Sequence, residues 1–292
     1  MATLFGTNAV DNLIGTVAAD TIFGAGGDDN LNGIGGNDNI YGDSGNDVLI
    51  GGAGFDFIYG GEGDDILNAT LPDDDNLFGG IGNDVYQVTR NTDTITEGFN
   101  QGIDTVRSSV TNNLLLINPN LENLVLTGAA NIDGTGNNLD NEITGNAGNN
   151  ALFGLVGNDV LTGAGGNDVL TGGFGNDQFI FNTALPASGI DTINDFVVGI
   201  DKIVLDKTFF PALETIAGNL LGIDFRVISQ PAFGEQIPAA TATEEIVYNR
   251  QTGNLFYNAD GAAAGFGIGG GQFATIVGSP DNLSNTDFTV IL

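Results

Sequence analysis

The 292-residue chain contains no histidine, no cysteine and no tryptophan, and only six lysines and arginines. Without histidine or cysteine it cannot form a Ser-His-Asp triad, a thiol nucleophile, a disulfide or a zinc site with imidazole or thiolate ligands. The metal ligands that remain are oxygen atoms of carboxylates, amides and backbone carbonyls. Oxygen ligands suit hard cations, and calcium above all.

Charge and hydropathy exclude further classes of partner. The chain has 37 acidic residues and a formal net charge of −31, which argues against nucleic acids and anionic membranes as partners. The longest apolar run, Leu114 to Ile117, has four residues, so we expect no transmembrane helix and no stable membrane insertion. The N-terminal residues carry no basic segment, so we expect no cleaved signal peptide.

The acidic residues are spread unevenly. Residues 1–87 contain fifteen acids and no lysine or arginine, while all six basic residues lie at or beyond Arg90. A compact fold in this part would repel itself unless an external cation neutralised it. The acids also recur at a fixed spacing, which favours cation binding over a merely soluble acidic surface.

A nine-residue repeat runs through two blocks of the chain. Nine units begin between Gly6 and Gly79, with one residue inserted at Ala69, and five more begin between Gly136 and Gly172. Of these fourteen units, position 1 is glycine in thirteen, position 4 is glycine in ten and position 6 is aspartate in twelve. Position 8 is apolar or aromatic in all of them. Such agreement indicates an array of equivalent structural units.

Each unit predicts a turn followed by a short strand. Glycines allow positive φ angles and a close approach to an ion, so the first six residues should form a turn with converging carbonyl groups. The aspartate at position 6 adds a carboxylate to this turn. The last three residues form a strand with only the position-8 side chain directed inward. One unit cannot bury that side chain alone, whereas stacked units can, which predicts a solenoid.

Two units, residues 51–59 (GGAGFDFIY) and 172–180 (GGFGNDQFI), show the full pattern. They resemble the calcium-binding nonapeptide of the RTX (haemolysin-type) family. The resemblance implies a right-handed parallel β-roll with two nonapeptides per coil and calcium ions between the loops of neighbouring coils. It also implies export by type I (ABC transporter) secretion machinery and an extracellular, secreted or cell-surface location.

The resemblance assigns calcium ligands to position-6 aspartates and to loop carbonyls. The predicted aspartates are Asp29, Asp38, Asp47, Asp56, Asp65, Asp84, Asp159, Asp168 and Asp177. The predicted loop glycines are Gly24, Gly26, Gly33, Gly35, Gly42, Gly51, Gly60, Gly154, Gly163 and Gly172. The units at Gly6, Gly15, Thr70 and Gly136 lack the position-4 glycine, so we expect their turns to differ.

Aromatic residues recur at position 9 of alternate units in the first block: Phe23, Tyr41, Tyr59 and Phe78. With two units per coil, these rings would stack on one outer face about 4.8 Å apart. A ladder that stabilises the stack by ring contacts is one interpretation. A docking strip for another domain, another copy or a sugar is the other.

We expect four segments along the chain. Residues 1–87 form the first β-roll block, 88–135 a spacer, 136–180 the second block, and 181–292 a C-terminal capping and secretion-signal domain. The spacer holds no nonapeptide, but segments such as 93–97 and 104–107 alternate in polarity. This alternation favours additional solenoid coils over a separate small domain.

The C-terminal segment is expected to form an antiparallel β cap with one short helix. Apolar residues on one side of residues 208–221 predict the helix, and residues 246–248 and 255–257 around a Gln-Thr-Gly-Asn turn predict a hairpin. Asp191, Asp195 and Asp201 fit a last calcium site or ordinary turns equally well. Residues 258–261 begin like an EF-hand loop but lack its later ligands, so we expect a turn. The final residues, an acid followed by an apolar run, resemble a type I secretion signal.

These patterns predict an all-β, secreted protein that folds when several Ca²⁺ ions bind between the β-roll loops. The alternative is a calcium-dependent adhesin or assembly module that uses the aromatic ladder or the C-terminal domain to bind a cell-surface polysaccharide or another surface component. A hydrolase is disfavoured, because the repeats start at Gly6 and any active site would lie in 181–292, where no catalytic motif occurs. We therefore expect no enzyme activity.

Overall fold

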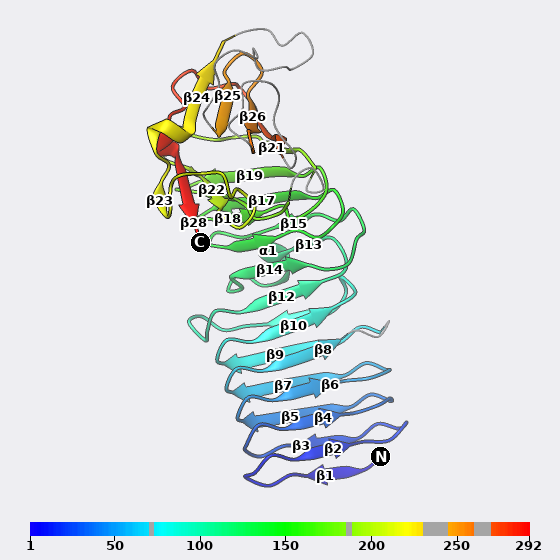
Figure 1. Ribbon diagram of the computed structural model, residues 1–292. Helices are drawn as coiled ribbons and strands as arrows, with labels where there is room; N and C mark the ends of the chain where they lie inside the picture. Colours follow the sequence, from blue (N-terminus) through cyan, green and yellow to red (C-terminus); the bar gives the residue numbers. More distant parts are fainter. Residues whose placement is uncertain (70–72, 185–188, 230–244, 260–269) are drawn as a thin grey trace. The chain divides into compact units, whose positions relative to one another are not determined.

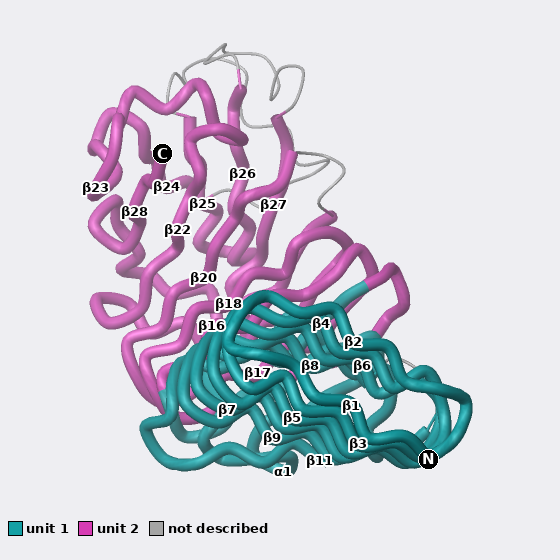
Figure 2. The backbone as a smooth tube through the Cα atoms, turned by 90° about the horizontal axis from the view of Figure 1, so that it is seen from below, with its two compact units in different colours: residues 1–127, 135–139 teal, residues 128–134, 140–292 magenta. Residues whose placement is uncertain are grey.

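The computed structural model describes residues 1–69, 73–184, 189–229, 245–259 and 270–292. The chain divides into two compact units (Figure 2), one made of residues 1–127 with 135–139 and the other of residues 128–134 with 140–292. None of the described helices has the length and apolar character needed to cross a membrane.

Unit 1 is a parallel β-solenoid, in which alternate nonapeptides supply two sheets (Figure 1). The first sheet has the order β1 (Thr3–Phe5), β3 (Thr21–Phe23), β5 (Asn39–Ser44), β7 (Phe57–Glu62), β9 (Asn76–Ile81) and β11 (Thr94–Thr96). The second runs through β2 (Asn12–Ile14), β4 (Asn30–Asn32), β6 (Val48–Ile50), β8 (Ile66–Ala69), β10 (Val85–Val88), β12 (Thr105–Ser108) and β14 (Asn123–Leu126). The expected all-β solenoid is confirmed.

The strand register places equivalent positions of successive coils directly over one another. Ile40 pairs with Ile58 between β5 and β7, and Leu31 pairs with Leu49 between β4 and β6. These position-8 side chains form the core and are at most 1% exposed. A strand of three residues thus contributes one buried side chain, and the stack of coils supplies the remainder of its packing.

The segment between the two blocks contains further strands of the same kind. β11 continues the ladder from β9, and β12 and β14 continue it from β10, all in parallel. The spacer also holds β13 (Asn112–Asn113) and the four-residue helix α1 (Leu114–Ile117), whose N-terminus is capped by the Asn113 side chain. β15 (Gly134–Thr135) follows. The spacer coils therefore carry longer loops around the same parallel strands.

Unit 2 begins with parallel strands, and its later strands pair both parallel and antiparallel. One sheet has the order β16 (Glu142–Thr144), β18 (Val160–Thr162), β20 (Gln178–Phe181), β22 (Lys202–Asp206), β28 (Phe288–Ile291) and β23 (Gly218–Asn219). The other runs through β17 (Ala151–Val156), β19 (Val169–Phe174), β21 (Asp191–Ile193), β27 (Gly271–Ile276), β26 (Asn254–Tyr257), β25 (Ile246–Asn249) and β24 (Phe225–Ile228). Two 3₁₀ helices, η1 (Gly222–Asp224) and η2 (Asn285–Asp287), precede β24 and β28.

The C-terminal cap shows the expected hairpin, because β25 and β26 pair antiparallel around residues 250–253. The cap is mixed rather than purely antiparallel, since β22 pairs with β28, and β24 with β25, in parallel. The predicted turn at 258–261 and the start of the unit at Thr70 extend outside the described residues.

The helix predicted over residues 208–221 is wrong. This segment consists of turns and the two-residue strand β23, and the nearest helix along the described chain is the three-residue η1. Side chains satisfy the backbone groups that helical bonds would use: Lys207 Nζ donates to the carbonyls of Leu213 and Thr215 at 3.0 and 2.8 Å. Asp224 accepts from the N–H groups of Glu214 and Thr215. The apolar residues that suggested a helical face, such as Phe210 and Leu213, are buried, but the backbone that carries them is irregular.

Candidate metal centre

Position-6 aspartates form hydrogen-bonded ladders along the stacked turns. The Oδ1 atom of each accepts from the backbone N–H of the position-6 residue one coil earlier: Asp38 donates to Asp56 at 2.8 Å, and Asp56 to Asp75 at 2.9 Å. Unit 1 has two ladders, one through Asp11, Asp29, Asp47, Asp65, Asp84 and Asp104, the other through Asp20, Asp38, Asp56, Asp75 and Asp93. Unit 2 has Asn141, Asp159, Asp177 and Asp201 in one ladder and Asn150, Asp168 and Asp191 in the other.

The other carboxylate oxygen of most of these aspartates is buried without a hydrogen-bond partner. These atoms are the Oδ2 of Asp29, Asp38, Asp47, Asp56, Asp65, Asp75, Asp84, Asp93, Asp159 and Asp168. Asp93 is 7% exposed and the others at most 1%. A buried charged oxygen without a partner costs free energy. Each of these ten turns therefore presents one unsatisfied carboxylate oxygen, a pattern that suits a cation bound from outside the chain.

The position-1 glycine of each unit lies against this oxygen. A Cβ atom added at Gly33 would come within 3.0 Å of both Asp38 Oδ2 and the carbonyl oxygen of Gly51 in the next coil. The same crowding against the unit's own Asp Oδ2 recurs at Gly24, Gly42, Gly51, Gly60, Gly154, Gly163 and Gly172. Glycine is required because any side chain would occupy the space where the carboxylate oxygen and the carbonyl oxygen converge.

Burial raises the pKa values of the ladder carboxyls. The pKa of Asp56, Asp65 and Asp159 rises to about 7, and that of Asp75, Asp84, Asp93, Asp168 and Asp177 to about 6. Loss of hydration is the main cause, and the charge of neighbouring ladder acids adds to it. The pKa of Asp29, Asp38 and Asp47 is raised for the same reason. The charged form of these groups is thus disfavoured without a counter-ion.

These groups fit calcium. The ligand set is carboxylate and carbonyl oxygen alone, arranged in irregular turns, and calcium accepts six to eight oxygen ligands in flexible geometry. Magnesium demands near-ideal octahedral geometry and keeps its water, which suits such turns less well. Each orphaned Oδ2 would act as a direct ligand, and the neighbouring loop carbonyls would complete the shell.

Comparison with known protein families identifies the repeats. A model of the RTX calcium-binding nonapeptide repeat matches residues 5–40, 41–71, 70–86, 135–170 and 144–179. The two blocks are RTX calcium-binding nonapeptide repeats. Calcium is the cation that such repeats bind.

Among solved structures, the extracellular lipase LipA from Serratia marcescens aligns with 97% of this chain at 18% identity and a TM-score of 0.25. The chain spans 40% of the length of that lipase. No curated protein sequence matches the chain.

The structure places the nine predicted RTX aspartates in the ladders, and eight of them have the orphaned Oδ2 atom. The eight predicted position-1 glycines lie beside the Oδ2 atoms of their own units' aspartates. Gly26 and Gly35 do not: their side-chain positions face Ser44 and Ala53 of the next coil rather than an aspartate. Gly26 and Gly35, which stand at position 3 of their units, therefore lie against the loop of the next coil and not against a carboxylate.

Sequence reasoning missed two ladder aspartates, Asp93 and Asp104, and counted a third, Asp75, at position 6 without predicting it as a ligand. Asp75 and Asp93 have orphaned Oδ2 atoms, and Asp104 is 1% exposed and accepts from Asp84 N–H at 2.8 Å. Asp93 and Asp104 lie in the spacer, where position 1 is not glycine, although Gly102 keeps the position-4 place before Asp104. The signal that could have found Asp93 and Asp104 is the last third of the nonapeptide, because each is followed by a short strand whose second residue is apolar.

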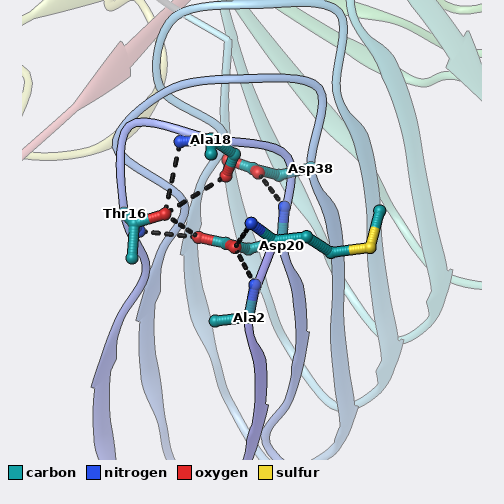
Figure 3. Close-up of polar contacts among 6 residues, drawn as sticks. Ala2, Thr16, Ala18, Asp20 and Asp38 are labelled. Atoms are coloured by element: carbon teal, nitrogen blue, oxygen red, sulfur yellow. Dashed lines mark hydrogen bonds and ion pairs between the residues drawn. The ribbon is translucent and has the colours of Figure 1, made fainter.

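The first two RTX units close their turns with a threonine. At position 2 of the second unit, Thr16 donates from both its backbone N–H and its hydroxyl to Asp20 Oδ2, each at 2.7 Å (Figure 3). Asp20 also accepts from Ala2 N–H, and these hydrogen bonds lower its pKa. Thr7 contacts Asp11 in the same way. The predicted difference of these turns is confirmed, because here the protein itself supplies the donors to the oxygen that is orphaned elsewhere.

The second block begins with asparagine instead. Asn150 Oδ1 accepts from Asn146 N–H at 2.8 Å, while its amide nitrogen donates to the carbonyl of Ile132. An amide at position 6 removes the charge and supplies a donor where aspartate has only acceptors. The opening units of both blocks therefore satisfy their turns without a cation.

The ladders extend into the C-terminal segment. Asp191 Oδ1 accepts from Asp168 N–H and Asp201 Oδ1 from Asp177 N–H, each at 3.0 Å. Asp195 accepts instead from the N–H groups of Gly172 and Gly173. Asp191 and Asp201 thus occupy position 6 of the next coils, while Asp195 closes a turn.

The aromatic residues at position 9 stack as expected. Ring centroids are 4.9 Å apart for Phe23 and Tyr41, 4.7 Å for Tyr41 and Tyr59, and 4.6 Å for Tyr59 and Phe78, with interplanar angles of at most 13°. Phe5, absent from the prediction, adds a fifth ring at 5.3 Å from Phe23. The stack follows from the register of the strands that carry it.

The raised pKa values predict how calcium-free protein responds to pH. Because the pKa of ladder carboxyls such as Asp56 is higher in the folded state, folding takes up protons, and stability falls as pH rises from about 4 to about 7. In chelator, far-ultraviolet circular dichroism should show more β structure at pH 4.5 than at pH 7.5. More β structure at the higher pH would contradict the burial of these carboxyls.

Proposed function

We propose that this protein is a secreted calcium-binding protein whose β-roll folds when several Ca²⁺ ions bind along the aspartate ladders. The observation that carries the proposal is the row of buried Oδ2 atoms without hydrogen-bond partners. No lysine or arginine occurs in residues 1–87, and the basic group that the structure shows within this block is the N-terminal ammonium of Met1, 3.7 Å from Asp20 Oδ1. Calcium would supply the missing charge and the missing contact together.

Binding and folding are coupled in this proposal. Without calcium, neighbouring ladder carboxylates repel, and the glycine-rich turns favour the unfolded ensemble. With calcium, each ion joins the loops of two coils, so its binding free energy becomes folding free energy. Extracellular calcium modules have dissociation constants on the order of 10⁻⁴ to 10⁻³ M. The chain would therefore stay unfolded where calcium is scarce and fold where it is abundant.

This coupling suits export of an unfolded chain. We infer that type I secretion (ABC transporter) machinery passes the calcium-free chain out of the cell and that the roll forms in the extracellular medium or at the cell surface. The support is the identity of the repeats, together with a fold whose ladders are electrostatically unfavourable in a calcium-poor cytosol.

We propose a binding role and no catalysis. Within the part of the chain that the structure describes, all the buried carboxylate oxygens without hydrogen-bond partners belong to the ladders. Their regular spacing suits repeated cation binding, whereas catalysis needs a small number of groups that converge on one substrate.

Calcium titration tests the coupling. Far-ultraviolet circular dichroism should change from a disordered to a β spectrum in a steep transition at millimolar calcium, because several sites fill together. Magnesium at the same concentration should fail to produce the change. A native spectrum in chelator, or no change with calcium, would refute calcium-dependent folding.

A matched pair of variants tests the ladder. Asp56→Asn removes the charge of an orphaned ligand but keeps the Oδ1 acceptor for Asp38 N–H, so the calcium midpoint should rise about 10-fold. Asp28→Asn removes one charge from an exposed acid and keeps its contact with Asn46 N–H, so it should leave the midpoint unchanged. Equal midpoints for both variants would show that the ladder carboxylates are not ligands.

The continuous aromatic stack favours a second candidate, a calcium-dependent adhesin. Tyr41 and Tyr59 are only partly buried, and with Phe23 and Phe78 they line one stacked row. Planar, partly exposed rings suit contact with an apolar sugar face of a cell-surface polysaccharide or with another surface component. Ring–ring contacts worth about 0.5–1.5 kcal/mol each would also stabilise the stack itself.

The double variant Tyr41→Ser/Tyr59→Ser separates these roles. If the row is a docking strip, calcium-dependent pull-down of cell-surface polysaccharide should be lost while the calcium midpoint for folding stays nearly unchanged. If the row only stabilises the coils, the midpoint should rise and no polysaccharide should bind to the wild type.

A further inference from the structure

Three buried carboxylates converge where the first RTX block meets the spacer. One ligand oxygen from each of Asp84, Glu97 and Asp104 lies within 4.8 Å of the others. Their exposed fractions are 0%, 5% and 1%. Asp84 belongs to the last nonapeptide of the block, but Glu97 and Asp104 lie beyond it and belong to no nonapeptide.

Glu97 occupies a place that a backbone carbonyl takes in the preceding coil. The register of β9 and β11 pairs Phe78 with Thr96, so Glu97 follows as the counterpart of Gly79. At Gly60, an added Cβ would meet Asp65 Oδ2 and the carbonyl oxygen of Gly79. At Gly79 it would meet Asp84 Oδ2, Glu97 Oε1 and the hydroxyl oxygen of Tyr86. Three side-chain oxygens therefore surround the glycine that faces the ladder.

The Glu97 side chain is held in this position by the protein. Tyr86 donates its hydroxyl to Glu97 Oε1, and Gly98 N–H donates to Oε2 at 3.2 Å. Tyr86 is a position-8 residue whose ring is fully buried in the core. The Glu97 carbonyl accepts from the amide groups of Asn118 and Asn120 at 3.2 and 3.0 Å. Both the backbone and the carboxylate of Glu97 are thus fixed.

The charge of this cluster is uncompensated by the groups that face it. Asp84 Oδ2 is fully buried without a hydrogen-bond partner and lies at the centre of the convergence. Asp64 and Glu122, which face the cluster, are acidic and raise the pKa of its carboxyls further. Of the nearest basic residues in the sequence, Arg90 pairs with Asp74 at 3.4 Å and Arg107 occupies an exposed position of β12.

We propose that Asp84, Glu97 and Asp104 hold a calcium ion at the end of the ladder that terminates at Asp104, with Glu97 supplying a carboxylate where other coils supply a carbonyl. Three carboxylates in one site give a higher ligand charge than one aspartate per turn, and higher ligand charge strengthens calcium binding. The site should therefore fill before those of the ladders. The ion would fasten residues 97–104 of the spacer to the last coil of the block. The proposal rests on the proposed function, because Asp84 and Asp104 belong to a ladder to which that function assigns calcium, and it adds Glu97 as a ligand.

The test is the number of calcium ions bound to full-length protein. Native mass spectrometry of wild-type protein, partly depleted with a weak chelator, should show one tightly held calcium ion. Glu97→Gln, which keeps the shape and removes the charge, should lose that ion and bind one fewer in total. Glu62→Gln, at the exposed end of β7 in the same unit, should match the wild type.

Equal counts for wild type and Glu97→Gln would overturn the site while leaving the ladder sites intact. A wild type that binds no calcium at all would refute the proposed function as well. If Glu97→Gln fails to fold, calcium anomalous scattering from wild-type crystals decides. A peak between Asp84 and Glu97 supports the site, and its absence in crystals with calcium along the ladders rejects it.

Discussion

The hydrogen bond from a backbone N–H to an aspartate Oδ1 one coil later determines how charge is arranged in this protein. It fixes one carboxylate per turn at the spacing of the strands, about 4.8 Å. At an effective dielectric constant of about 20, two charges at this distance repel by on the order of 3 kcal/mol. The same bond leaves Oδ2 beside a glycine, within reach of the next coil's carbonyl. The geometry that aligns the coils thus also creates the sites that need a cation.

The coils differ in how they balance this charge. In the central units, such as the one containing Asp56, no donor in the described structure makes a hydrogen bond to Oδ2. Thr16 supplies two hydrogen-bond donors to Asp20, and Asn150 replaces the charge by an amide. At the end of the first block, Glu97 adds charge. Turns with the same backbone arrangement therefore include some that need a cation and some that do not.

Much of the fold and of the ladders could be predicted from the sequence. The nine-residue repeat occurs in many copies, and each copy shows the same strand, turn and ligand positions. Asp104 was not predicted because Phe99 stands at the position-1 place, although Gly102, the aspartate and the strand after it keep the pattern. The Tyr86–Glu97 contact depends on the register between β9 and β11, which residue spacing in an irregular loop does not specify. The helix predicted at 208–221 failed because Lys207 and Asp224 capture the backbone groups it needed, and both lie outside the apolar pattern that suggested it.

The threonine-closed turns at Thr7 and Thr16 and the amide-closed turn at Asn150 have a consequence for how such a stack is built. A one-dimensional array of identical steps has no preferred starting point, since each step costs the same. Here the first units of each block supply their own hydrogen-bond donors to the turn. The free energy of adding such a unit therefore differs from that of adding the units that follow. The order in which the coils form therefore depends on the single side chains at positions 2 and 6, while the strands of all coils are alike. Exchanging a threonine for a glycine at such a position would move the starting point along the chain and leave the architecture unchanged.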